Sequence, residues 1–159
     1  MRITTKEVKH EVDGQELTFQ IKKMDALHGS YLMKFCAEKF LPFLNDVQDL
    51  FGGEEPKDDR DVEEIAKERT NKIFALIPKV LSTLSEEELI SFEKRCLNTV
   101  SVLKPAGWQP VLYGDNFGIE ELEDDLMTVL VLCYEVVEFN IGSFFGGNRL
   151  ASFLPQQNT

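Results

Sequence analysis

The sequence predicts an α+β fold, mainly α, in which an N-terminal β-hairpin packs on a bundle of about four helices. Three features indicate it. Residues 2–22 alternate apolar and polar side chains, helical apolar spacing recurs through residues 25–145, and residues 119–145 form an acid-headed, almost wholly apolar stretch. With 43% hydrophobic content in 159 residues, the chain has enough apolar material for one core. We therefore expect a single globular domain over residues 1–148 and a loose C-terminal tail at 149–159.

A two-residue turn signal indicates where the predicted hairpin reverses direction. Asp13-Gly14 is the kind of dipeptide that closes a two-residue hairpin, and it separates the two alternating segments. The positions expected to share the apolar sides of the two strands are Ile3, Thr5 and Val8 on the first and Leu17, Phe19 and Ile21 on the second. Because an isolated hairpin is marginal in water, this face must pack on the helices that follow, which we favour, or extend the sheet of a neighbouring chain.

Three helices should precede the last one. The first is capped by Asp25 and perturbed at Pro42, and its apolar positions are Leu27, Tyr31, Leu32, Met33, Phe35, Cys36, Phe40, Phe43 and Leu44. Residues 52–61 are too charged to bury apolar area and predict a mobile acidic loop. The second helix should begin near Asp61, kink at Pro78 and bury Ile73, Phe74, Ile77, Val80, Leu81 and Leu84. The third starts with a Ser-Glu-Glu-Glu capping box and carries Leu89, Ile90, Phe92 and Cys96.

The connection to the last helix is expected to be irregular. Residues 99–103 are β-branched and alternating, which predicts a short strand, whereas two prolines and a glycine in residues 104–110 predict a loop. Asp115 to Gly118 then supply cap residues for the final helix. Its positive dipole end should receive five acids, Glu120, Glu121, Glu123, Asp124 and Asp125.

The final helix carries apolar residues on nearly every face. Only Thr128 and Glu135 are polar between Leu126 and Val137, so we expect this helix to be buried in a bundle or against a partner. If part of it is exposed, the candidate partner-binding residues are Leu126, Leu130, Cys133, Val137, Phe144 and Phe145. Phe144 and Phe145 can equally close the core or project into a partner's groove. Trp108, in the proline-containing loop, is either a lid over the core, which we favour, or an exposed interface anchor.

Charge narrows the class of partner. The formal net charge of −11 and the pI near 4.6 make binding to nucleic acid or to an anionic membrane unfavourable, because phosphate binding relies on clustered Lys and Arg. The three cysteines are widely spaced in apolar contexts and indicate reduced core thiols rather than disulfides or metal ligands. The first residues lack the apolar region of a signal peptide, and no apolar run is long enough to span a bilayer. The expected partners are proteins and the expected location is the cytoplasm.

No catalytic constellation is present in the sequence. It contains no GxSxG, Walker, HExxH or dinucleotide fingerprint, and His10 and His28 lack metal-ligand spacing. The acidic clusters at residues 54–64 and 120–125 lack the EF-hand pattern. We therefore expect no catalytic residue, no metal and no cofactor, and an enzyme is the least favoured reading.

The layout resembles a known family. A short N-terminal hairpin, helices with a charged insertion, a capped third helix, a β-like connection and a last apolar helix ending in Asn140, Phe144 and Phe145 are similar to the tail assembly chaperones of long-tailed bacteriophages and prophages. The resemblance covers most of residues 1–150. It implies a non-enzymatic protein that binds the hydrophobic, helical tape measure protein, keeps it soluble during tail morphogenesis in the host cell cytoplasm, and is absent from the finished virion. It also implies self-association, and the tail tube protein is a further candidate partner.

Two other readings stay open. An acidic phage inhibitor that mimics DNA would explain the net charge, but it should carry acids in phosphate-like rows rather than in two local clusters. A structural tail or adaptor protein would share the layout and should be found in purified virions.

Overall fold

The structure, a computed structural model, describes residues 2–40, 43 and 62–145. The predicted acidic loop at 52–61 and the predicted tail at 149–159 lie outside these residues. The described residues group into two compact units, and the first comprises Met1–Gly29 and Ser85–Asn140. Ser30–Leu84 and the chain after Asn140 form the second. The single domain over residues 1–148 therefore stays a prediction, while the broad α+β class is confirmed.

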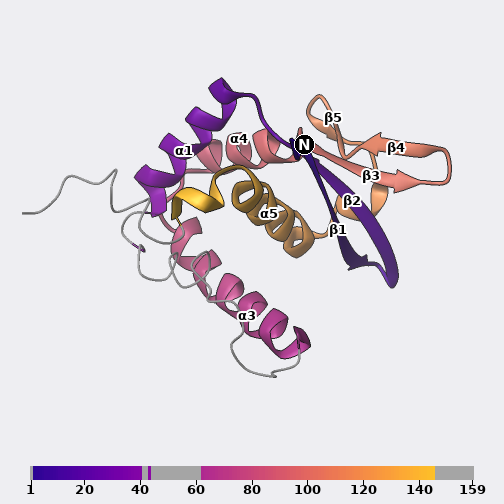
Figure 1. The fold of residues 1–159 in the computed structure, drawn as a ribbon, viewed down its shortest axis with the longest axis horizontal. Coiled ribbons are helices and arrows are strands. Elements are labelled where there is room, and N and C mark those ends of the chain that lie inside the picture. The colour runs from indigo at the N-terminus through magenta and orange to yellow at the C-terminus, as the bar shows by residue number, and fades with distance from the viewer. Residues whose placement is uncertain (1, 41–42, 44–61, 146–159) are drawn as a thin grey trace, which may run out of the picture. The chain divides into compact units, whose positions relative to one another are not determined.

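The first unit is built on a four-stranded antiparallel sheet in the order β1-β2-β3-β4 (Figure 1). The predicted hairpin is its first half, with β1 at Thr5–Val12 and β2 at Gln15–Lys22 paired in full register. Asp13 and Gly14 have φ of 52° and 78°, as a two-residue turn that matches the twist of the strands requires. Leu17, Phe19 and Ile21 are buried, as predicted.

The first strand corrects our expectation of its buried face. Ile3 precedes the strand and is exposed, and Thr5 is exposed as well. The inward side chains are Val8, His10 and Val12, because these positions pair with Phe19, Leu17 and Gln15 across the hairpin. A strand with a period of two cannot place Thr5 and Val8 on the same face.

The second half of the sheet contains a strand that the sequence reading missed. β3 at Val100–Lys104 was expected, but β4 at Gly107–Pro110 folds back onto it where a loop was predicted. Pro105 and Ala106 form the reversal and Gly107 follows with a φ of 118°. Pro110 is tolerated because β4 is an edge strand.

Helices α4 and α5 complete the first unit beside the sheet (Figure 1). α4 spans Glu86–Leu97 and has the predicted capping box, with Ser85 Oγ accepting from the Glu88 amide at 3.1 Å and Glu88 accepting from the Ser85 amide at 3.1 Å. Its buried residues are Cys96 and Leu97, whereas Ile90 is exposed.

A small antiparallel ribbon and a 3₁₀ helix lie between β4 and α5. β5 at Leu112–Tyr113 pairs with β6 at Asn116–Phe117, and the 3₁₀ turn η2 covers Glu120–Leu122. α5 runs from Leu126 to Phe145. The last helix therefore starts later than predicted, because Asp115 lies in the ribbon's turn and Asn116–Phe117 form its second strand instead of a cap.

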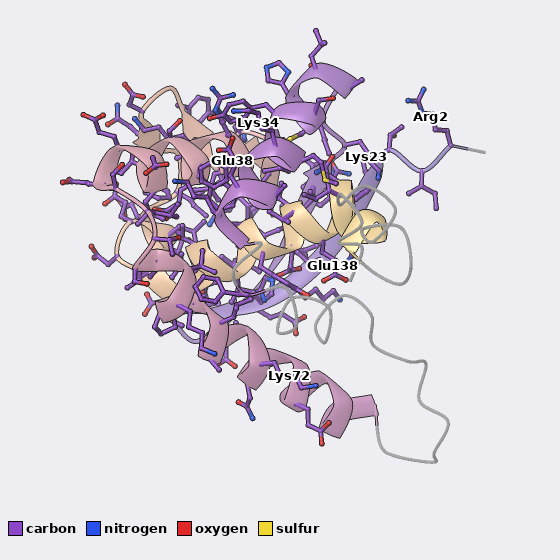
Figure 2. The ribbon with its side chains drawn as sticks, turned by 90° about the vertical axis from the view of Figure 1, so that its left-hand side faces the viewer. Arg2, Lys23, Lys34, Glu38, Lys72 and Glu138 are labelled. Atoms are coloured by element: carbon purple, nitrogen blue, oxygen red, sulfur yellow. The ribbon has the colours of Figure 1, made fainter. Side chains whose placement is uncertain are left out.

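Two further helices belong to the second unit, one for most of its length and the other entirely. α1 spans Ala26–Phe40 and begins as predicted, with Asp25 Oδ1 accepting from the His28 amide at 2.9 Å. Its buried residues are Leu32, Phe35 and Cys36, whereas Leu27 and Tyr31 are exposed. On the exposed side of α1, Lys34 and Glu38 form an ion pair at 3.0 Å (Figure 2). Phe40, although in α1, has no described side chain, and Leu44 lies outside the described residues.

α3 spans Val62–Leu81, close to the predicted second helix, and includes Pro78. The expected burial of its apolar face is not found: Phe74 is exposed, and Ile77, Val80, Leu81 and Leu84 are only partly covered. The side chain of Ile73 is not described.

Candidate partner-binding surface

The start of α5 exposes large apolar side chains. Leu126 is 64% exposed and Met127 is 43% exposed. Asp125 holds this end of the helix, because its carboxylate accepts from the Thr128 amide at 3.0 Å and from the Thr128 hydroxyl at 2.7 Å. The cap fixes where the first turn begins, so Leu126 and Met127 are presented on an ordered helix end.

α5 has two apolar stripes with different surroundings. The first is buried and consists of Val129, Leu132, Cys133, Val136 and Val137. The second is exposed or partly exposed and consists of Leu126, Met127, Leu130 and Val131, which we call the α5 stripe. Because residues three and four apart share a helix face, the α5 stripe is continuous over more than one turn.

Exposed acids precede the α5 stripe in the sequence. Glu120, Glu123 and Asp124 are exposed, and none forms an ion pair with a basic side chain of the described residues. Neighbouring acids are paired: Lys104 contacts Glu121 at 2.6 Å and Lys94 contacts Asp115 at 2.9 Å. These hydrogen bonds and charges lower the pKa values of Glu121 and Asp115.

Trp108 lies on a strand and is not a lid over the core. It stands on β4 opposite Leu103 of β3, and the two side chains are 39% and 45% exposed. Val102 is fully buried, so the adjacent Leu103 and its partner Trp108 occupy the outer face of the sheet. Trp108 is therefore exposed, and its role as an interface anchor stays a prediction.

Residues 139 and 140 of α5 are hydrogen-bonded to the two residues that follow β2. The Asn140 side chain accepts from the Met24 amide at 2.8 Å and donates to the Val136 carbonyl at 2.9 Å. Lys23 donates to the Phe139 carbonyl at 2.7 Å and lies 4.7 Å from the centre of the Phe139 ring. Asn140 thus has a structural role.

Comparison with known families decides the relationship. The model of the family described as phage tail assembly chaperone protein, TAC, matches residues 15–151. The chain belongs to this family. In the same comparisons, neither a curated protein nor a solved structure matches the chain. The matched range includes β2, the whole of α5 and every described element between them.

The residues predicted as a partner surface of this tail assembly chaperone separate into groups. Leu126 is exposed, Leu130 is partly exposed, and Trp108 is exposed on a different element. Cys133 and Val137 are buried in the core, because α5 turns that face inward. Phe144 and Phe145 belong to α5, but their side chains lie outside the described part of the chain. Sequence reasoning missed Met127, although its position beside Leu126 gives it the same exposed turn.

All three thiols of the chaperone are core groups. Cys36, Cys96 and Cys133 are free and buried. The hydrogen bond with Cys96 and burial raise the pKa of Cys133, and burial raises the pKa of Cys36. A thiol with a raised pKa is mainly protonated and unreactive at neutral pH.

The sequence reading treated His10 as an ordinary polar residue, but the structure gives it a specific partner. Its Nε2 contacts the Glu135 carboxylate, and both side chains are largely covered. Glu135 is the lone acid between Leu126 and Val137, so its position in an apolar run was the available signal of a buried pair.

Over the described residues, the chaperone has no group of three His, Cys, Asp or Glu side chains that could hold a metal ion. The same part of the chain contains no helix that is long and apolar enough to span a membrane.

Proposed function

We propose that this tail assembly chaperone binds the hydrophobic, helical tape measure protein and keeps it soluble during tail morphogenesis in the host cell cytoplasm. Membership of the family supports the general role. The observation that carries the specific proposal is the exposure of Leu126 and Met127 at the ordered start of an apolar helix whose other stripe is buried. An apolar helical face of this kind suits the apolar face of another helix.

The surroundings of the α5 stripe fit a chaperone for an apolar client. Leu126, Met127 and Leu130 offer contact area, while the acids at positions 120, 123 and 124, just before α5 in the sequence, are exposed. Apolar contact would supply affinity, since buried apolar area contributes roughly 25 cal/mol per Å². The net charge of −11 would keep the complex soluble by repulsion between complexes.

Co-expression tests the proposal. The chaperone is produced with the large helical tape measure protein of the same genome, and the soluble fraction is analysed by size exclusion with light scattering. We expect the tape measure protein to be soluble only in the presence of the chaperone and to elute with it in a stoichiometric complex. A tape measure protein that stays insoluble beside a soluble chaperone contradicts the proposal.

A matched pair of variants tests the surface. The double change Leu126→Ser and Met127→Ser removes exposed apolar area from the first turn of α5, so we expect at least a tenfold loss of complex with unchanged thermal unfolding. The control is Leu27→Ser, because Leu27 is 83% exposed in the first turn of another helix, α1. Equal loss in both variants, or in neither, would remove the α5 stripe from the binding surface.

A further inference from the structure

β1 is an edge strand with an unpaired outer side. β1 and β4 are the edges of the four-stranded sheet, and no described strand pairs with the side of β1 that faces away from β2. β1 is eight residues long and β4 only four. A long edge presents a row of free amide and carbonyl groups that another strand can pair with.

The register fixes which groups are free. The Lys23 amide donates to the Thr4 carbonyl at 2.8 Å, so Thr4 and Lys23 form a hydrogen-bonded pair. Hydrogen-bonded and non-hydrogen-bonded pairs alternate along an antiparallel ladder, so the even-numbered residues of β1 bond to β2. The outward groups are those of Thr5, Glu7, Lys9 and Glu11.

The side chains of these outward residues suit a second copy of the same strand. A two-fold axis at Val8 would place Glu7 of each copy opposite Lys9 of the other, and Thr5 opposite Glu11. Both kinds of pair would be hydrogen-bonded pairs, because all four residues direct their main-chain groups outward. Opposite charges directly across an antiparallel ladder are favourable.

Neighbouring registers are disfavoured. Moving the axis by one residue toward the N-terminus sets Glu7 against Glu7, and moving it one residue toward the C-terminus sets Lys9 against Lys9. Edge strands commonly use charged residues to prevent pairing. In β1 the charges oppose the two registers next to this one and favour the register with its axis at Val8.

We propose that two copies of this chain associate through β1, antiparallel about a two-fold axis at Val8, so that two four-stranded sheets form one continuous sheet of eight strands. On the inner face Lys6 stands opposite His10, whose ring contacts the Glu135 carboxylate. A closed two-fold contact of this kind also covers the free edge. The proposal goes beyond client binding: it uses neither Leu126 nor Met127, and its test contains no client protein.

Variants that exchange charges on β1 test the register. The dissociation constant of the dimer is measured for the full-length chain by sedimentation equilibrium at low salt. We expect the unchanged chain to be a dimer. Lys9→Glu sets glutamates opposite each other twice and should raise the dissociation constant about tenfold or more. Adding Glu7→Lys to that variant restores opposite charges and should restore the dimer. Glu11→Gln is the control, since Glu11 faces Thr5 and its neutralisation should leave the constant unchanged.

Cross-linking gives a second readout that is independent of charge. Val8→Cys places two thiols across the axis, where β-carbons of a non-hydrogen-bonded pair lie about 4.5–5.5 Å apart. Because Cys36, Cys96 and Cys133 are buried, mild oxidation should link the chains only through position 8. Glu11→Cys faces Thr5 and should cross-link far more slowly. A monomeric chain, a dimer that Lys9→Glu leaves intact, or equal cross-linking at both positions overturns the proposal.

Discussion

Gly118 occupies a position where a side chain has no room. A β-carbon built there would lie 2.7 Å from the Pro110 carbonyl oxygen and 2.7 Å from a ring carbon of Tyr113. The Gly118 amide also donates to the Val111 carbonyl at 2.7 Å, so the backbone cannot withdraw without losing this bond. We expect Gly118→Ala to lower the free energy of unfolding by about 1–3 kcal/mol, measured by urea denaturation.

The control for this substitution is Gly29, in the first half of α1. Nothing lies within 4 Å of a β-carbon at Gly29, and its backbone is helical. Gly29→Ala should therefore raise the free energy of unfolding by about 0.5–1 kcal/mol, through reduced entropy of the unfolded chain. The same change should thus have opposite signs at the two positions, and equal effects would contradict the predicted clash at Gly118.

For single residues, the sequence predicted contacts between near neighbours in the chain and missed contacts between residues far apart in it. The bond from Asp25 to the His28 amide spans three residues and follows from helix capping rules. The contacts of Asn140 with Met24 and of His10 with Glu135 span 116 and 125 residues. No local pattern specifies such pairs, so Asn140 was read only as part of a motif and His10 as an ordinary polar residue.

The capping box of α4 is the element start that local rules specify best. Ser85 and Glu88 satisfy each other's amides at 3.1 Å, at the helix end that would otherwise leave them without partners. We expect Ser85→Ala to lower the free energy of unfolding by about 1 kcal/mol. Thermal denaturation should then show a decrease in Tm of about 2–4 °C.

The control is Ser82→Ala, the same change three residues earlier. The Ser82 hydroxyl donates to the Lys79 carbonyl at 2.8 Å on an exposed surface and caps no amide. Its loss should shift Tm by less than half as much as the loss of Ser85, since water can replace this partner. A larger effect at Ser82 would show that the capping box does not set the stability of α4.

Elements were predicted well where a turn or cap signal and the apolar periodicity agreed. The β1–β2 hairpin, the first turn of α1 and the start of α4 each had a turn or cap signal beside a clear periodicity. β4 was missed because Pro110 suggested a loop, although an edge strand tolerates proline. α5 was started too early because two successive cap signals precede it, and only the second, Asp125, begins the helix.

For the whole molecule, the periodicity of the apolar residues predicted the α+β class but not how its parts assemble. Strands β1 to β4 form one sheet because β2 pairs with β3, although helices α1, α3 and α4 separate these two strands in the sequence. That pairing joins residues about 80 positions apart in sequence, so alternation alone could not predict it. The candidate surface was only partly predictable for the same reason: the apolar sequence of α5 does not reveal which stripe the sheet and α4 cover.

The net charge of the whole chain gives the last prediction. With 28 acidic and 17 basic residues, repulsion between carboxylates should outweigh the exposed ion pairs, which are individually weak. Raising NaCl from about 20 to 300 mM at pH 7 screens this repulsion. It should increase Tm by about 2–4 °C, which corresponds to roughly 1 kcal/mol for a chain of this size.

The pH dependence of the salt effect separates repulsion from attraction. Near the pI of about 4.6 the net charge vanishes, so the salt effect on Tm should vanish as well. The pairs of Lys94 with Asp115 and Lys104 with Glu121 lower the pKa values of both carboxyls, so they stabilise the fold above the ordinary values of 3.8 and 4.5. That contribution is lost as the pH falls through the lowered values, and Tm should decline there at any salt concentration. If salt lowered Tm at pH 7, these ion pairs rather than carboxylate repulsion would dominate the electrostatics of the folded chain.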